Sequence, residues 1–388
     1  MARLGDIATV ITKGTTPTSI GFAFENDGIN FVKIESVDEN GNFICEKFDH
    51  ISDECHEKLK RSQLQENDIL FSIAGAIGRT AIVTKDILPA NTNQALAIIR
   101  IPQGAINYSF LLYILQSSVV LEQAEKKKQG VAQLNLSLKD IGDFIIPDIP
   151  LEEQQCIVDS LDKVSNLISL RKQQLSKLDE LVKSRFIELF GLPNLNDKGW
   201  LKGVINDIGI CVAGATPSTQ VKEYWENGTI PWMSSGEVNK GRVFETDTKI
   251  TQLGYDNAST KLVPPKTVVL AMAGQGKTRG TAAITEIELC TNQSICSIVN
   301  NEKVNSEYLL YFLKLQYMEL RGASTNTDGR GGLNLKIIGN YPIMIPPIEL
   351  QNKFAAFVEQ VDKSKLAIQK SLEKLETLKK ALMQKYFG

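Results

Sequence analysis

The chain contains an internal duplication with a period near 200 residues, and this repeat constrains its fold more than any other feature. Lys-Gly-Thr-Thr-Pro (13–17) returns as Ala-Gly-Ala-Thr-Pro (213–217), and Thr-Asn-Gln (92–94) returns as Thr-Asn-Gln (291–293). The motifs keep their order and differ only by small gaps. Because solenoid units are about 20 to 50 residues long, the longer period predicts two copies of a whole domain.

Each copy changes character along its length. The first part is mixed, with short apolar runs such as 69–73 and 95–99 that are typical of strands, and one helical stretch near 107–126. A stretch without Pro or Gly follows, at 151–190 in the first copy and 350–387 in the second. Both stretches repeat apolar residues at intervals of three and four, which predicts long helices.

The apolar positions of the two long stretches follow a heptad pattern over four heptads, which is typical of a coiled coil. Arg171, Arg185, Ser364 and Ser371 interrupt it. Two such helices in one chain, each leading to or following a globular domain, are expected to pair with each other and to lie antiparallel. The predicted seam consists of Leu161, Val164, Ile168, Leu175, Leu178, Val182, Leu189, Phe354, Phe357, Val361, Ile368, Leu375, Leu378 and Leu382.

The expected fold class is therefore α+β. Two similar mixed α/β domains are separated by two long antiparallel helices that form a coiled coil, and the chain has a pseudo-twofold internal repeat. The predicted boundaries are 1–150 and 192–347 for the globular domains and 151–191 and 348–388 for the helices.

The sequence lacks the motifs of common enzymes. Residues 271–278 end like a phosphate-binding loop, but position 271 is Ala instead of Gly and no helix is predicted to follow. The chain has only two histidines, which disfavours His-based triads and metal sites. A net charge of −2 gives no basic footprint. We expect a non-catalytic chain that binds no cofactor and no metal.

Several features indicate a cytoplasmic protein. The start of the chain lacks the pattern of a signal peptide, and no apolar run approaches the roughly 20 residues that span a bilayer. The six cysteines form no CxxC pair, which favours reduced thiols. We expect no membrane association.

Two domain copies, each followed by a heptad helix, resemble the specificity subunit of a type I restriction–modification system over essentially the whole chain. Each motif is weak alone, but the order occurs twice. The matching motifs are Lys-Gly-Thr-Thr-Pro (13–17), Ala-Gly-Ala-Ile-Gly-Arg (74–79), Thr-Asn-Gln (92–94), Ile-Pro-Asp-Ile-Pro-Leu-Glu-Glu-Gln (146–154) and the junction Phe-Gly-Leu-Pro…Lys-Gly-Trp (190–200). The second helix entry, Ile-Pro-Pro-Ile-Glu-Leu-Gln (345–351), lacks the acidic pair of the first, which leaves open whether both helices bind partners equivalently.

The resemblance implies that each globular domain is a target recognition domain, which reads one half of a split, asymmetric site in double-stranded DNA. The helices would fix the unread spacer and dock two methyltransferase subunits. Those partners would bind S-adenosylmethionine and methylate adenine, and restriction subunits would join to cleave unmodified DNA.

Candidate DNA contacts combine polar side chains with predicted loops, since Arg, Lys, Asn and Gln pair with base edges and Thr and Ser suit phosphates. The candidates are Lys13, Thr15, Thr16, Arg79, Asn93, Gln94, Thr216, Ser218, Gln275, Lys277, Arg279, Asn292, Gln293 and Arg330. A competing interpretation is that motifs shared by both copies serve the fold, with Asn93, Gln94, Asn292 and Gln293 as buried hydrogen-bonding groups. Positions at which the copies diverge, such as 275–279 and 326–332, are then the better candidates.

Two other functions stay open. The chain could be the specificity chain of another multi-subunit methyltransferase system, or a coiled-coil scaffold with two ligand-binding domains. Sequence-specific DNA binding in the presence of partner subunits distinguishes the scaffold from both kinds of specificity chain. A self-contained nuclease is disfavoured by the missing motifs.

Overall fold

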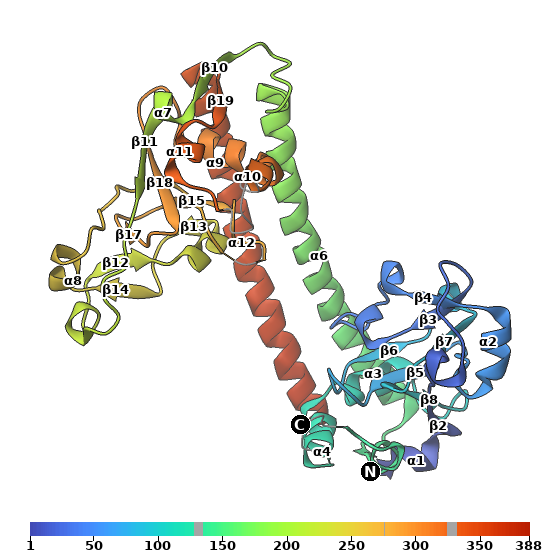
Figure 1. The fold of residues 1–388 in the computed structure, drawn as a ribbon. Coiled ribbons are helices and arrows are strands. Elements are labelled where there is room, and N and C mark those ends of the chain that lie inside the picture. The colour runs from blue at the N-terminus through green and yellow to red at the C-terminus, as the bar shows by residue number, and fades with distance from the viewer. Residues whose placement is uncertain (128–134, 275, 324–331) are drawn as a thin grey trace. The chain divides into compact units, whose positions relative to one another are not determined.

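The computed structural model describes residues 1–127, 135–274, 276–323 and 332–388, and these residues form two compact units (Figure 1). Unit 1 contains Met1–Lys172 and Lys370–Gly388, and unit 2 contains Gln173–Gln369. Each unit combines one copy of the globular repeat with one end of each long helix.

Unit 1 is built on two sheets and a short strand pair. The four-stranded sheet has the order β2 (Val10–Lys13), β8 (Leu96–Arg100), β5 (Ile69–Ser72) and β6 (Thr80–Ile82). The three-stranded sheet has the order β4 (Asp49–Ile51), β3 (Ile29–Val32) and β7 (Ala90–Thr92), and β1 (Ala2–Arg3) pairs with β9 (Ile145–Ile146). Its shorter helices are α1 (Leu4–Ile7), α2 (Asp53–Lys58), α3 (Tyr108–Leu115), α4 (Ser118–Lys127) and α5 (Leu138–Gly142).

The central strands of unit 1 are buried on both faces, which explains their uninterrupted apolar sequence. Ile69 and Phe71 of β5 belong to a core that also contains Phe110 of α3, whereas Leu70 of the same strand packs in a core with Val32 of β3. Successive side chains of a strand point to opposite faces. The four-stranded sheet therefore lies between a helical layer and the three-stranded sheet.

Unit 2 repeats this arrangement with one added strand. Its main sheet has the order β11 (Gly209–Ala213), β18 (Ile295–Asn300), β15 (Val268–Ala271), β16 (Ala282–Thr285) and β13 (Arg242–Val243). The smaller sheet is β14 (Thr248–Ile250), β12 (Ile230–Met233) and β17 (Cys290–Thr291), and β10 (Leu201–Val204) pairs with β19 (Pro342–Ile345). The shorter helices are α7 (Ile205–Ile208), α8 (Gln252–Asp256), α9 (Ser306–Leu315), α10 (Tyr317–Ala323) and α11 (Leu335–Gly339). The predicted duplication of a mixed α/β domain is confirmed.

The two long helices are α6 (Leu151–Phe190) and α12 (Ile348–Phe387). In unit 1, Leu161 near the start of α6 shares a core with Phe387 at the end of α12. In unit 2, Phe190 at the end of α6 shares a core with Phe354 near the start of α12, and the two rings meet edge to face. The helices are antiparallel, as predicted, and each end of the coiled coil is part of one globular core.

The buried face of α12 differs from the predicted heptad seam. Phe354, Val358, Val361 and Leu372 are buried, whereas Leu378, which was expected in the seam, is 46% exposed. The buried positions follow a period near 3.6 residues, because a straight α-helix drifts by about 20° per heptad from a 3.5-residue repeat. The prediction for Leu378 was therefore wrong, and Phe357 is only partly buried.

The helical stretch predicted near 107–126 is two helices, α3 and α4. They are separated at Gln116 and Ser117. The side chain of Gln116 donates a hydrogen bond to Thr80 Oγ1 at 2.8 Å. Gln316 occupies the same break between α9 and α10 in unit 2. Among the described residues, no helix is both long and apolar enough to cross a membrane.

Candidate nucleic-acid interface

The loop after β2 carries the first group of candidate DNA contacts and is fixed against the loop after β7. The backbone N–H of Gly14 donates to the carbonyl of Asn93 at 3.1 Å, and the hydroxyl of Thr16 is hydrogen-bonded to the side-chain oxygen of Gln94. A Cβ atom at Gly14 would overlap the carbonyl oxygen of Thr92. The close approach of the two backbones therefore requires glycine.

The equivalent loop of unit 2 is fixed in the same way. Thr216 is hydrogen-bonded to Gln293, and a Cβ atom at Gly214 would overlap the carbonyl oxygen of Thr291. Trp232 Nε1 adds a hydrogen bond to the carbonyl of Ala215 at 3.0 Å. The shared motifs thus make the same internal contacts in both copies, which supports the interpretation that they serve the fold.

Burial separates the members of these loops. Asn93 and Asn292 are half-buried, and the side-chain oxygen of each accepts from a backbone N–H two residues on, at 3.0 Å. Gln94 and Gln293 are exposed, so the expectation that these four residues are all buried was wrong. The side chains at the rims of the two loops are Lys13, Gln94, Thr216, Ser218 and Gln293, all exposed, and Thr15 and Thr16, half-buried.

Arg79 lies apart from this group and has a structural role. Its Nη1 donates to the carbonyls of Ile34 and Val37, at 3.2 and 2.9 Å. The guanidinium is half-buried and holds the turn that follows β3. Arg79 is therefore a weaker candidate for base contact than its place in the repeat suggested.

The turn between β15 and β16 carries Lys277 and Arg279, and α10 fixes its backbone. Tyr317 donates its hydroxyl to the carbonyl of Lys277 at 2.9 Å, and Arg321 Nη1 donates to the carbonyls of Gly276 and Arg279 at 2.8 and 3.2 Å. The side chain of Lys277 is exposed, and Arg279 is half-buried. In unit 1 the corresponding turn packs against Leu121 instead. The two copies therefore present different turns here.

Two candidates, Gln275 and Arg330, lie outside the described residues. The phosphate-loop-like segment at 271–278 leads into strand β16 and not into a helix, which removes the amide cradle that such a loop needs. Within the described residues, no group of three or more His, Cys, Asp or Glu side chains is placed to hold a metal ion.

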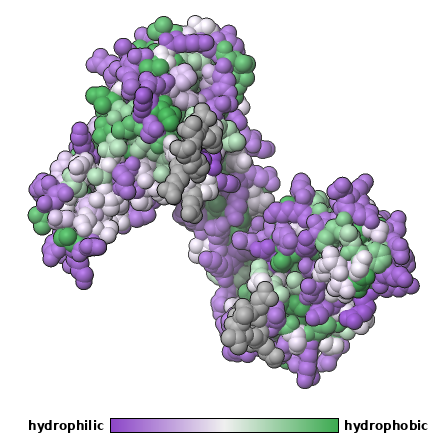
Figure 2. Space-filling model, in the orientation of Figure 1, coloured by the Kyte–Doolittle hydropathy of each residue, from purple (hydrophilic) through white to green (hydrophobic). Residues whose placement is uncertain are grey.

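The surface is mainly polar. On the face drawn in Figure 2, hydrophilic side chains cover most of each unit, and hydrophobic ones form smaller patches. Since the chain has 43 basic and 45 acidic residues, its overall charge gives little attraction for a phosphate backbone.

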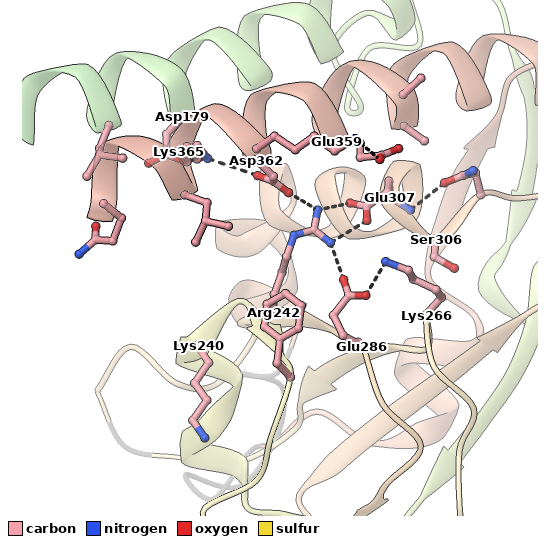
Figure 3. Close-up of a pocket in the computed structure, with 18 residues that line it drawn as sticks. Asp179, Lys240, Arg242, Lys266, Glu286, Ser306, Glu307, Glu359, Asp362 and Lys365 are labelled. Carbon is pink, nitrogen blue, oxygen red and sulfur yellow. Dashed lines mark hydrogen bonds and ion pairs between the residues drawn. The ribbon is translucent and has the colours of Figure 1, made fainter. Parts of the chain in front are cut away.

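A charged cleft of about 1090 Å³ lies in unit 2 beside α12, and Figure 3 shows the side chains that line it. Arg242 of β13 points into the cleft and contacts Glu286, Glu307 and Asp362. Lys266 pairs with Glu286 at 2.5 Å, and Lys365 pairs with Asp179 of α6. The cations and anions in this part of the cleft compensate one another. The arrangement therefore joins the sheet to the helices and offers little net charge to a ligand.

Sequence reasoning missed the residues that fix the start of each long helix. Gln154 in the first turn of α6 accepts a hydrogen bond from the backbone of Asn107, and Gln351 in the first turn of α12 accepts one from the backbone of Asn305. The separations along the chain, 47 and 46 residues, are nearly the same in both copies. Both helix-entry motifs, 146–154 and 345–351, end in these glutamines, but the motifs alone do not identify the asparagine partners.

Comparison with known proteins agrees with this architecture. The model of the type I restriction modification DNA specificity domain matches twice, at residues 1–180 and 197–380. The chain is 25% identical to the type I restriction enzyme MjaIX specificity subunit of Methanocaldococcus jannaschii, over 82% of this chain and 76% of that protein. It is 24% identical to the putative MjaX specificity subunit of the same organism, over 98% and 91%.

Two solved structures share the fold. A chain from a study of complex assembly and conformational transition in a type I R-M system superposes with a TM-score of 0.61 at 19% identity, covering 100% of this chain and 96% of that one. The type I S subunit from M. genitalium superposes with a TM-score of 0.59 at 15% identity, covering 100% and 95%. With both halves matched by one family model, the chain belongs to the type I restriction–modification DNA specificity family, and it carries two copies of that family's domain.

Proposed function

We propose that each globular copy reads one half of a bipartite, asymmetric site in duplex DNA, and that α6 and α12 set the length of the unread spacer between the halves. In this proposal the same helices dock two methyltransferase subunits, which bind S-adenosylmethionine and methylate adenine. Restriction subunits complete the assembly. The chain itself catalyses nothing.

The observation that carries this proposal is the reciprocal sharing of the two helices between two similar cores. The start of α6 and the end of α12 enter the core of unit 1, and the end of α6 and the start of α12 enter that of unit 2. The rise along a helix is 1.5 Å per residue. A coiled coil whose ends are embedded in two reading domains is therefore suited to act as a ruler.

The proposal that two different half-sites are read is supported by the divergence of the two copies outside their shared loops. Arg79 is committed to backbone contacts in unit 1, whereas the turn around Lys277 in unit 2 leaves an exposed lysine on a fixed backbone. Two domains with one framework and different exposed side chains are expected to prefer different bases.

Docking of partner subunits on the helices is supported by leucines that face solvent in this single chain. Large apolar groups on an exposed helix surface are typical of a binding site when they recur along it. The exposed leucines of the two helices include Leu167, Leu170, Leu181, Leu366 and Leu378.

Modified-base sequencing of genomic DNA tests this function directly. Cells with the intact gene are expected to carry a methylated adenine motif in two short parts with a fixed gap, and cells with the gene deleted are expected to lack it. A third strain carries seven extra residues between Lys172 and Gln173 and seven between Gln369 and Lys370. Matched insertions keep the antiparallel helices in register and lengthen the pair by about 10 Å, or about three base pairs.

The expected result of the insertions is a spacer about three base pairs longer between unchanged half-sites. A motif that does not depend on the gene would contradict the recognition function and favour a scaffold. An unchanged spacer in the insertion strain, with the motif retained, would contradict the ruler alone.

A further inference from the structure

The first turn of each long helix carries one buried glutamine whose amide oxygen and nitrogen are both hydrogen-bonded. Gln154 and Gln351 are 4% and 0% exposed. Their side-chain oxygens accept from the backbone N–H groups of Asn107 and Asn305, both at 2.8 Å. Their nitrogens donate to the carbonyls of Ile149 and Pro346, also at 2.8 Å. Gln351 donates further to the carbonyl of Lys303 at 3.2 Å.

The two asparagines complete this joint from the side of the globular copy. The side-chain oxygen of Asn107 caps α3 through the backbone N–H of Phe110 at 3.1 Å, and its side-chain nitrogen donates to Gln155 Oε1 at 2.8 Å. Asn305 makes the corresponding contacts with Glu307 of α9 at 2.9 Å and with Asn352 Oδ1 at 2.9 Å. In each copy, one asparagine thus caps a helix of the globular domain and also contacts the residue that follows the buried glutamine in the long helix.

This amide latch, defined as Asn107 with Gln154 and Gln155 in unit 1 and Asn305 with Gln351 and Asn352 in unit 2, is the same in both copies although their surroundings differ. The acidic pair beside Gln154 is absent beside Gln351, where Leu350 precedes the glutamine. Other polar contacts between globular domain and long helix differ between the copies. Arg242 bridges Glu307 and Asp362 in unit 2, whereas Tyr113 donates to Asp162 in unit 1. Among the described residues, the latch is therefore a polar joint that the two copies have in common.

The latch has the properties of a rigid joint. A buried amide whose oxygen and nitrogen are both hydrogen-bonded is costly to displace, because each lost bond leaves a desolvated polar group. The contacts involve neutral groups, so salt does not screen them as it screens ion pairs. The helix pair can select one spacer length only when each recognition domain is attached to it rigidly.

We propose that Gln154 and Gln351 are positioning residues for spacer selection, each fixing its recognition domain to the helix that begins beside it. This proposal rests on the proposed function, since it assumes that the two domains read two half-sites across a spacer. Neither glutamine is assigned a contact with DNA. Its loss should change which spacers are accepted and leave the bases read unchanged.

The test replaces Gln351 in the full chain, expressed with its methyltransferase and restriction partners, and maps methylated adenines across the genome. Gln351→Met keeps the length and the unbranched shape of the side chain but removes both hydrogen-bonding functions. We expect the same two half-sites, with methylation at spacers one base pair shorter or longer increased by about tenfold or more over the wild type. Gln154→Met should broaden the spacer in the same way.

Two further variants keep the outcome decisive. Gln360→Met makes the same chemical change at an exposed position of α12 and should retain the single spacer. Asn352→Ala removes only the exposed arm of the latch, so it folds even if Gln351→Met does not accumulate, and it should broaden the spacer to a smaller extent. A uniform fall in methylation at one unchanged spacer, in both Asn352→Ala and any folded Gln351→Met, would overturn the positioning role. Absence of a bipartite motif in the wild type would instead overturn the proposed function, and the role of the latch with it.

Discussion

The guanidinium of Arg242 donates two parallel hydrogen bonds to the carboxylate of Glu307, with nitrogen–oxygen distances of 2.7 and 2.8 Å. The same group also contacts Glu286 at 2.9 Å and Asp362 at 2.7 Å, so it joins β13, α9 and α12. Burial alone would lower the pKa of Arg242, but the hydrogen bond to Glu307 and the charges of Glu307 and Asp362 outweigh it and raise that pKa.

Replacement of Arg242 by Met should strongly destabilise unit 2. Arg242 is 22% exposed and two of its three carboxylate partners are 13% exposed, so its loss leaves partly buried anions without their main counter-ion. We expect the free energy of unfolding to fall by about 3 kcal/mol, measured by denaturant unfolding. Lys363→Met is the control, because Lys363 and Glu359 form an exposed i,i+4 pair that should contribute little to stability. Equal effects of the two substitutions would contradict the role of the cluster.

The hydroxyl of Tyr113 in α3 ties the globular part of unit 1 to α6, where it donates to Asp162 Oδ1 at 2.6 Å. Burial, and then the hydrogen bond to Asp162, raise the pKa of Tyr113 to about 12. The folded state therefore keeps this proton to higher pH than the unfolded state, whose tyrosine titrates near 10. The contribution to stability is complete below pH 10 and is lost as the pH rises from about 10 to about 12.

Between pH 10 and pH 12, the free energy of unfolding of Tyr113→Phe should therefore fall by about 2 kcal/mol less than that of the wild type. At neutral pH the variant should be about 1 kcal/mol less stable than the wild type. Unfolding free energies measured at neutral pH and from pH 10 to pH 12 check both effects. Asp162→Asn keeps a hydrogen-bond acceptor and removes the charge. The fall of its unfolding free energy between pH 10 and pH 12 should therefore lie between those of the wild type and Tyr113→Phe. A Tyr113→Phe slope equal to that of the wild type would contradict the assignment.

Much of the fold was predictable because it follows from repetition and hydrophobic period. The order of the motifs predicted two copies of one domain, and heptad spacing predicted two long paired helices. The alternation of domains and helices along the chain predicted that the pair is antiparallel. The phase of α12 was not predictable from the heptad pattern. Val358 is buried in α12 where the heptad pattern predicted Phe357, and Leu378 is exposed. The reason is that a straight helix keeps 3.6 residues per turn.

The candidate site was less predictable because hydrogen-bond partners are set by tertiary contacts. Thr16 and Gln94 are 78 residues apart, and only the fold shows that they bond to each other. Arg79 looked suited to a base edge, but two backbone carbonyls use its guanidinium. Gln154 lies in the helix-entry motif 146–154, but the motif does not show that its side chain pairs with Asn107, an arrangement that the second copy repeats.

Exposed leucines on the long helices should contribute to partner binding. Leu170 of α6 and Leu366 of α12 are 53% and 57% exposed, so an aspartate at either position should fold and should place a charge in any partner interface. We expect Leu170→Asp and Leu366→Asp each to weaken association with the methyltransferase subunits by at least about tenfold, measured by co-purification and titration. Leu201→Asp, at an exposed position of strand β10 instead of a long helix, is the control. Full retention of binding by both helix variants would place the docking surface elsewhere.

Arg79 and Lys277 should behave differently although they occupy related turns of the two copies. Arg79→Ala removes two hydrogen bonds to backbone carbonyls, so it should destabilise unit 1 by about 1 to 3 kcal/mol and lower methylation at every site without changing the motif. Lys277→Ala removes an exposed side chain from a turn that Tyr317 and Arg321 hold in place. It should leave stability unchanged and reduce discrimination or affinity at one half-site only, by about tenfold or more. Modified-base sequencing together with thermal unfolding separates the two outcomes. Loss of both half-sites in a stable Lys277→Ala variant would show that this turn does not read one half of the site.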